Sequence, residues 1–355
     1  MKFSDKCTVS HYKPEELSSW ASQVLQANHM SAREADQTAR LLVRSDQRGY
    51  YTHGLVRLPS YVDRLREGAV NPNPVITIAR NASAWSVDAD GALGQVLGMH
   101  VIEAAGPYLQ REPLLWVNVR RTGHLGALGI LALEAAEAGF ICLMGQRTPP
   151  LLGLPGFQRR AIGNNPFAFA APAGNGRPPF VFDMACSVAA RGHILLAARE
   201  GKPVPADWAL ASDGTPTTDA GVAVYGMLQP AGGYKGMGLS MMIECMAAAF
   251  CAEAGSTGDI SMEVHANGAG GRQSAFFLFL NPAVTGDRNA FTEYMHHWMD
   301  HYAESSSEAR IPGHRADTLE AESYENGIAY SLQIEAELQC FGRRFGIQMP
   351  SPSIY

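Results

Sequence analysis

The sequence contains no excess of basic charge, no long apolar run and no closely spaced pair of cysteines. Its 28 Lys and Arg residues stand against 34 Asp and Glu, a net charge of -6, and no basic stripe is present that could follow a phosphate backbone, so we expect no nucleic-acid partner. Charge or glycine interrupts every apolar run well short of a membrane span. Residues 1–6 lack the apolar core of a signal peptide, and we therefore expect a cytoplasmic protein that does not enter membranes.

The signatures of several enzyme classes are also missing. No G-x-G-x-x-G follows the first predicted strand, as a Rossmann dinucleotide-binding domain requires. No G-x-S-x-G occurs and no cysteine adjoins a histidine, which leaves no pattern for nucleophilic catalysis. His296, His297 and His301 cluster, but their spacing places no further ligand, so we expect no metal site. The cysteines are scattered and we expect reduced, mostly buried thiols, with three of them in apolar surroundings: Cys142, Cys245 and Cys251.

Length and hydrophobic pattern predict a two-part α/β protein. A chain of 355 residues with 46% hydrophobic and 17% charged residues is typical of about two globular domains. Helical patterns cover 14–26, 31–44 with a capping box formed by Ser31 and Glu34, and 57–67. From Val75 onward short apolar strands alternate with helical patterns, which argues for an α/β fold. We expect a helical module at 1–74, completed by 288–355, and an α/β cofactor and substrate domain at 75–287.

The densest group of chemically active side chains lies at residues 46–57. It combines Asp46, Arg48, His53 and Arg57 with two glycines. Histidine titrates near neutral pH, and an arginine four residues further on can lie one helical turn away and bind a carboxylate with its planar guanidinium. A proton donor beside such a cation indicates chemistry on a small organic acid. The alternative for this segment taken alone is a helix end at Gly49 followed by a solvated polar turn.

Further segments have the composition of ligand-binding turns. His124 lies in residues 122–126, between an expected strand and an expected helix, where α/β proteins place ligand-binding groups. Residues 232–238 open a helix with two glycines and Lys235, which suits a phosphate or a carboxylate. Residues 164–166 and Asp183, at a strand end, complete the set. Each motif is weak by itself, because the same residues are common in purely structural turns.

Taken in chain order, these segments resemble one family, the malate/L-lactate dehydrogenases that bind nicotinamide cofactors without a Rossmann fold. Ureidoglycolate and sulfolactate dehydrogenases, diketogulonate reductases and reductases of cyclic imino acids are members. The resemblance implies a non-Rossmann malate/L-lactate dehydrogenase-like α/β fold, with a helical module packed on a mixed-sheet cofactor domain. It also implies a homodimer with its active site near the subunit interface. The matching segments are 46–61 with Gly68, 123–126, 163–172, 183–187, 213–218, 232–238 and 310–313.

The resemblance further implies roles for individual residues. His53 is expected to protonate the carbonyl oxygen or imine nitrogen of the substrate as hydride reaches the carbon. Arg57 is expected to bind the substrate carboxylate, with Arg48 assisting. The implied cofactor is NAD or NADP, with NADPH slightly favoured, although the sequence itself does not distinguish them. The residues expected to contact it are His124, Leu125, Gly126, Thr148, Asp183, Met184, Ala185, Tyr234, Lys235, Arg310, Pro312, Gly313 and His314.

Three positions depart from the family pattern. Thr52 replaces the serine that usually precedes the catalytic histidine, so the hydroxyl of the proton relay is kept and a methyl is added. His193 stands where cyclic imino acid reductases carry an aspartate that completes the relay, and a protonated imidazole there would lower the pKa of His53. Asn164 replaces a threonine, which predicts an atypical substrate pocket.

The sequence thus predicts an NAD(P)H-dependent oxidoreductase that acts on a small 2-oxo acid or cyclic 2-imino acid, or on the corresponding 2-hydroxy or amino acid. One alternative is a member that binds nucleotide but has lost or exchanged hydride transfer, such as a tautomerase or an imine-forming enzyme. The three departures motivate it. A non-enzymatic binding module is the remaining alternative, and it leaves the presence of both His53 and Arg57 unexplained.

Overall fold

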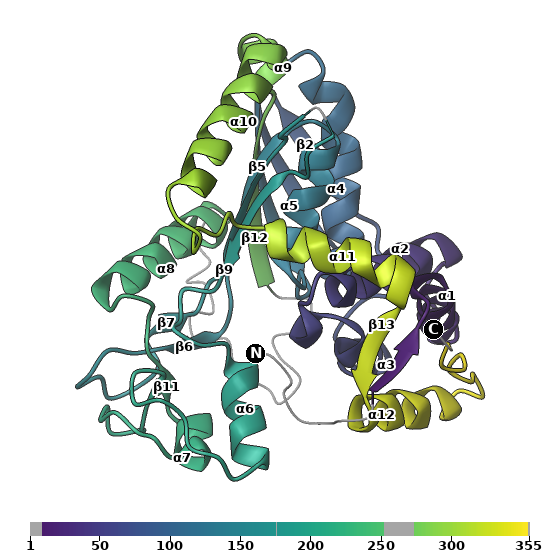
Figure 1. Cartoon of the computed structure of the whole chain (residues 1–355), viewed down its shortest axis with the longest axis vertical. Coiled ribbons are helices and arrows are strands. Elements are labelled where there is room, and N and C mark those ends of the chain that lie inside the picture. Colours follow the sequence, from purple (N-terminus) through teal and green to yellow (C-terminus); the bar gives the residue numbers. More distant parts are fainter. Residues whose placement is uncertain (1–8, 175, 252–272, 354–355) are drawn as a thin grey trace.

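A seven-stranded mixed sheet forms the centre of the computed structural model, which describes residues 9–174, 176–251 and 273–353 (Figure 1). Its strand order is β2-β3-β4-β12-β5-β8-β9, and only the β3–β4 pair is parallel. The strands are β2 Thr77–Asn81, β3 Ala84–Asp88, β4 Leu114–Thr122, β5 Ile141–Gln146, β8 Phe167–Ala171, β9 Phe180–Met184 and β12 Gln273–Leu280. The mixed α/β class expected from the sequence is confirmed.

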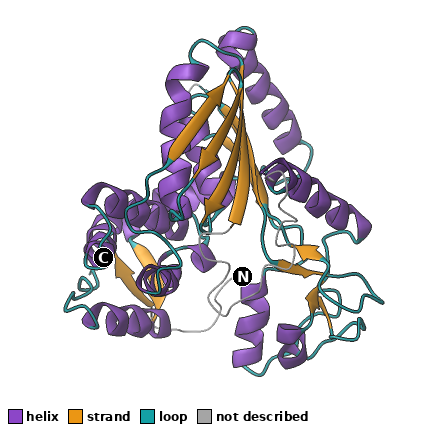
Figure 2. Cartoon of the chain, turned by 180° about the vertical axis from the view of Figure 1, so that it is seen from behind, coloured by secondary structure: helices purple, strands orange, loops and turns teal. Residues whose placement is uncertain are grey.

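Alternation along β12 shows how the two faces of this sheet are covered. Phe277 belongs to the core formed with α4 (Gly94–Leu109) and α5 (Leu128–Glu137), whereas its neighbour Phe276 packs with Ile243 of α8 (Tyr234–Ala247) on the opposite face. Successive side chains of a strand point to opposite faces, so an unbroken apolar strand is buried on both sides. On the α8 side, α10 (Arg288–Glu304) covers the edge formed by β8 and β9 through Met295 and Met299. Figure 2 shows the sheet from behind.

A helical lobe lies to one side below the sheet. Its helices α1 (Pro14–Gln26), α2 (Ala32–Gln47) and α3 (Leu58–Arg66) share one core with α12 (Leu332–Arg343). The side chain of Ser31 accepts a hydrogen bond from the Glu34 amide at 3.3 Å, as the capping box predicts. Distant parts of the chain complete the lobe, because β1 (Val9–Tyr12) pairs with β13 (Ile328–Ser331), and α11 (His314–Asn326) reaches α2 through the ion pairs of Arg44 and Arg48.

A smaller lobe lies on the other side (Figure 1). It is built on a four-stranded sheet of order β10-β11-β6-β7 and packs around Leu152, Ile194 and Leu228. Its elements are β6 Pro150–Leu152, β7 Ile162–Gly163, α6 Arg191–Arg199, β10 Ala209–Leu210, α7 Ala220–Tyr225 and β11 Met227–Leu228. The lobes approach one another at α6, since a Cβ on Gly192 would lie 3.7 Å from the Thr52 methyl group.

Several expectations about local structure are altered. The helix predicted from residue 57 begins at Leu58, because two 3-10 turns precede it: η1 (Tyr51–His53) and η2 (Leu55–Arg57). The expectation of mostly buried thiols is wrong for Cys245 and Cys340, which are exposed, while Cys142 is buried and Cys7 lies outside the described residues. Within the described ranges, no helix combines the length and the apolar character that crossing a membrane needs.

Candidate active site

The chain reverses sharply between α2 and α3, and this turn carries His53 and Arg57. Gly49 follows the end of α2 and has a φ of 77°, a conformation that favours glycine. A Cβ at this position would lie 2.8 Å from Leu319 of α11. The amide of His53 then donates to Tyr50 O at 2.8 Å, and the amide of Arg57 donates to Gly54 O at 2.9 Å. Short 3-10 turns thus present both side chains from one compact loop.

His53 contacts its own turn and the loop that follows β4. Its Nδ1 is 2.9 Å from the Thr52 hydroxyl, and its ring stacks on the ring of His124 with centroids 5.7 Å apart and planes 24° from parallel. Burial, and after it the positive charge of Arg57, lower the pKa of His53 to about 4. The uncharged imidazole therefore predominates at neutral pH in the free protein.

Partners that the sequence did not single out orient His124. The Tyr61 hydroxyl lies 2.9 Å from His124 Nδ1 and itself accepts a hydrogen bond from Gln95 Nε2 at 3.1 Å. The amide of Gly126 also donates to this Nδ1, at 3.3 Å, so Nδ1 is an acceptor and the neutral ring carries its proton on Nε2. Burial holds the pKa of His124 well below its usual value, and the charges of His53, Arg57 and Arg64 add to this.

Tyr61 and Arg64 were detectable in principle, because they follow Arg57 by four and seven residues and therefore lie with it on one helical face. Arg64 is half-buried, and its Nε and Nη1 have no hydrogen-bond partner. Without the contact between α3 and the loop of His124, however, this face has no visible relation to a histidine 60 residues away.

The two arginines expected to bind substrate differ in their surroundings. Arg57 donates from Nε to Thr52 O at 2.6 Å and forms no ion pair with a carboxylate in the part of the chain that the structure describes. Arg48 is instead 2% exposed and pairs with Asp317, at 2.7 Å, and with Glu320. Its guanidinium is therefore engaged with α11, and the assisting role expected for it would require these ion pairs to open.

The loops expected to bind cofactor lie around the ends of the central strands. The amide of Leu125 donates to Gln146 Oε1 at 3.0 Å, which ties the His124 loop to β5. Asp183, at the end of β9, accepts a hydrogen bond from the amide of Gly129 in α5 at 2.8 Å. Burial raises the pKa of Asp183 to about 6. Met184 pairs with Phe167 in the sheet, and half-buried Ala185 follows.

The remaining candidates come from three separate segments. The Thr148 hydroxyl donates to Asn164 Oδ1 at 3.0 Å, so the expected cofactor and substrate residues are in direct contact there. Tyr234 and Lys235 open α8 and are both exposed. The segment 310–314 adjoins β9, where Pro312 O accepts from the Val181 amide at 3.5 Å and Gly313 has φ of 93°. Arg310 is exposed, and half-buried His314 begins α11.

His193 forms no hydrogen bond or ring contact with His53 in the part of the chain that the structure describes. It lies exposed on α6, with its ring 6.0 Å from that of Trp208, although its neighbour Gly192 adjoins Thr52. A relay through His193 stays a prediction. In the described ranges, no group of three His, Cys, Asp or Glu side chains is arranged to hold a metal ion.

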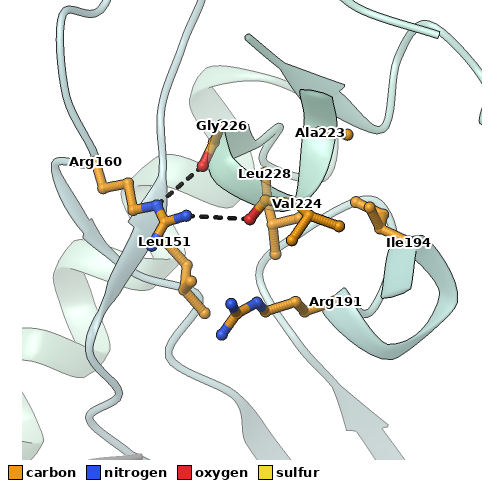
Figure 3. Close-up of a pocket in the computed structure, with 8 residues that line it drawn as sticks. All are labelled: Leu151, Arg160, Arg191, Ile194, Ala223, Val224, Gly226 and Leu228. Carbon is orange, nitrogen blue, oxygen red and sulfur yellow. Dashed lines mark hydrogen bonds between the residues drawn. The ribbon is translucent and has the colours of Figure 1, made fainter. Parts of the chain in front are cut away.

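A small pocket in the other lobe is separate from this site (Figure 3). Arg160 anchors one wall by donating to Gly226 O at 2.9 Å and Val224 O at 3.3 Å, and Arg191 lines the same space. The space has room for about one water molecule, so it does not accommodate an organic substrate or a dinucleotide.

Comparison with known proteins identifies one group of relatives. The model of the family described as malate/L-lactate dehydrogenase matches residues 12–339. The Δ1-pyrroline-2-carboxylate reductase of Ancylobacter novellus is 33% identical over 324 residues, which cover 90% of this chain and 94% of that protein. The structure of malate dehydrogenase from Pyrococcus horikoshii superposes with a TM-score of 0.85 at 27% identity, covering 99% of each chain.

Two further relatives are named for different cofactors. The (2R)-3-sulfolactate dehydrogenase (NADP(+)) of Chromohalobacter salexigens is 34% identical over 66% of this chain and 70% of that protein. The ureidoglycolate dehydrogenase (NAD(+)) of Escherichia coli is 37% identical over 59% of each. The relatives are thus dehydrogenases and reductases of small acids, and they do not agree on one nicotinamide cofactor.

Proposed function

The chain belongs to the malate/L-lactate dehydrogenase family, and on that premise we propose that it is an NAD(P)H-dependent reductase of a small 2-oxo acid or cyclic 2-imino acid. The observation that carries the proposal is the pairing, within one turn, of His53 with Arg57, a guanidinium that no described carboxylate neutralises. A buried or half-buried cation without a counter-charge is a site for an anion. Here that anion is the carboxylate of the substrate, and the adjacent imidazole faces its reactive carbon substituent.

Reduction of C=O or C=N adds a hydride to carbon and a proton to oxygen or nitrogen, and a bound reduced nicotinamide supplies the hydride. His53 supplies the proton, with the Thr52 hydroxyl holding Nδ1 so that Nε2 is directed to the substrate. The low pKa of His53 in the free protein results first from burial and then from Arg57. A substrate carboxylate bound to Arg57 neutralises the charge that lowers the pKa of His53. We therefore expect substrate binding to raise this pKa and favour the protonated imidazole that donates the proton.

The start of α8 supports a dinucleotide site in the proposed function. Gly232 and Gly233 both have positive φ, and no side chain caps the N-terminus of the 14-residue helix α8 that follows. Amides at such a terminus together with the exposed Lys235 suit a pyrophosphate. We propose that Lys235 and this helix start hold the phosphates, and that His124 and Asp183 hold the nicotinamide end. NADPH is slightly favoured over NADH.

We also propose a cytoplasmic homodimer. Its support is a set of exposed apolar side chains on α6, α7 and α8, since exposed apolar surface marks interaction sites. Their exposed fractions reach 48% on α6, 81% on α7 and 53% on α8. The residues are Leu195, Leu196, Val222, Tyr225, Met241 and Met242.

The test is the oxidation of NADH and NADPH with a panel of substrates: pyruvate, larger 2-oxo acids, Δ1-pyrroline-2-carboxylate and Δ1-piperideine-2-carboxylate. We expect turnover with at least one of them, and Arg57→Lys to raise KM about 10- to 100-fold, because lysine cannot form the bidentate contact. Arg33→Lys, at an exposed position outside the site, is the matched control. If either cofactor binds tightly but no acid is reduced, the chain is a nucleotide-binding member that has lost or exchanged hydride transfer.

A further inference from the structure

Asp46 is a buried carboxylate that the proposed chemistry does not use. It lies in the last turn of α2 and is 1% exposed. Its Oδ2 accepts two hydrogen bonds, from the Leu55 amide at 2.8 Å and from the Tyr330 hydroxyl at 2.6 Å. Leu55 stands between His53 and Arg57, so one of these bonds is made to the backbone of the turn that carries both.

Contact with Gly54 adds a steric element to the same arrangement. A Cβ at Gly54 would lie 1.9 Å from Asp46 Oδ1 and 2.2 Å from Asp46 Cγ. The φ of Gly54 is −88°, so the left-handed conformation is not what requires glycine here. The carboxylate group lies directly against the backbone between the two 3-10 turns, and glycine at this position permits that approach.

Tyr330 holds the carboxylate from the far end of the chain. It is 1% exposed in β13, and its hydroxyl reaches Asp46 across 284 positions of sequence. The β1–β13 ladder, in which Tyr330 pairs with Ser10, fixes the backbone of this tyrosine. Asp46 therefore joins three elements: the end of α2, the turn at 51–57, and β13.

We propose that Asp46 is the positioning residue of the catalytic turn, holding Leu55 so that His53 and Arg57 face one substrate together. The inference rests on the proposed function for its catalytic readout, but the structural joint itself does not. Burial raises the pKa of Asp46 to about 7, but Oδ2 accepts both hydrogen bonds whether the carboxyl group is charged or neutral, and in a buried site nothing else replaces them. Loss of the joint frees the 3-10 turns, which have few bonds of their own.

Two substitutions differ in how much of the acceptor they remove. Asp46→Asn keeps the shape and one acceptor oxygen, whereas Asp46→Leu removes every acceptor but is larger than aspartate, so Tyr330→Phe, which removes one donor and adds no bulk, accompanies it. We expect Asp46→Leu to lower kcat about 100-fold and to raise KM for the acid, since a misplacement of about 1 Å has an effect of this size. Asp46→Asn should retain roughly a tenth of the activity or more. The Kd of the cofactor, held by other elements, should change less than about twofold in both.

Readouts that do not need turnover test the joint separately. Hydrogen exchange in peptides covering residues 51–58 should be faster in Asp46→Leu and Tyr330→Phe than in the wild type. Tyr12→Phe is the matched control, because the Tyr12 ring packs on Tyr330 at 6.0 Å and makes no hydrogen bond to Asp46. Gly54→Ala should abolish activity in the wild type and add little further loss in an Asp46→Ala background, where the obstructing carboxylate is absent.

The outcomes distinguish the two proposals. Unchanged exchange at 51–58 together with at least half the wild-type kcat in Asp46→Leu would overturn the positioning role, whatever the substrate. So would additive losses from Gly54→Ala and Asp46→Ala. If exchange responds as expected but the wild type reduces no acid of the panel, the joint stands and the proposed reduction fails.

Discussion

The two lobes that meet below the central sheet differ in how their charged and apolar side chains are satisfied. In the helical lobe, the buried Asp46 and Arg48 have partners from the same chain: Asp46 accepts from Leu55 and Tyr330, and Arg48 pairs with Asp317 and Glu320. The smaller lobe instead exposes Tyr225 and several other large apolar side chains to solvent. The helical lobe thus satisfies these buried side chains within the chain, whereas the smaller lobe leaves apolar side chains exposed.

The largest effect should come from the turn itself. Replacing His53 by Ala removes the proton donor, and we expect kcat to fall by about 10² to 10⁴ while the Kd of the cofactor is retained. Single-turnover rates and fluorescence titration of NADPH measure the two quantities. If this variant retained most of its turnover, His53 would not be the proton donor, and the helical lobe would not supply the catalytic group.

Loss of a buried charge partner should show how strongly the helical lobe depends on its ion pairs. Arg48→Met leaves Asp317 and Glu320 uncompensated, and we expect the free energy of unfolding to fall by about 3 kcal/mol. Urea denaturation provides the measurement. Arg310→Met, which removes an exposed pair with Glu308 at 3.4 Å, is the control and should change it by less than about 0.5 kcal/mol. Equal losses in the two variants would contradict the distinction.

The charge of Arg57 should couple anion binding to protonation of His53. In the free protein the pKa of His53 is about 4, and an anion on Arg57 raises it, so the complex binds more protons than the free protein. The affinity for oxamate, an unreactive carboxylate analogue, should therefore strengthen as pH falls from 7 toward 5, by no more than tenfold per pH unit. Calorimetric titration in two buffers measures the proton uptake. The His53→Asn variant should show a flat profile, and a flat profile in the wild type would refute the coupling.

The smallest effect is expected on α6. His193 is exposed and its ring lies against Trp208, so His193→Ala should change kcat/KM by less than about threefold. Steady-state kinetics with the best substrate of the panel checks this. A loss of kcat/KM as large as that of His53→Ala would contradict this expectation. It would mean that the smaller lobe also supplies a catalytic residue, because α6 would have to bring His193 into a relay with Thr52.

Local signals predicted much of the secondary structure. The helix at Pro14–Gln26 has the predicted bounds, and the Ser31 capping box begins α2 where expected. The short apolar strands expected from Val75 onward include β12, which spans Gln273–Leu280. Short elements of the smaller lobe, such as β6 and β11, were missed, because two or three residues provide too few positions for a periodic pattern.

The proximity of His53 and Arg57 was also predictable, since four residues separate them and local hydrogen bonds shape the turn. Their partners were not. Tyr61 reaches His124 across 63 positions, and Arg48 reaches Glu320 across 272. No local pattern encodes such separations.

The sequence by itself determined the α/β class, the helix starts and the spacing of the catalytic turn, because each depends on interactions between residues a few positions apart. Only the tertiary structure decided that Tyr330 anchors Asp46, that Arg48 is engaged with α11, and that the ring of His193 lies against Trp208. These outcomes depend on the order of strands in the sheet and on which side chains are buried against one another, and both are properties of the whole chain.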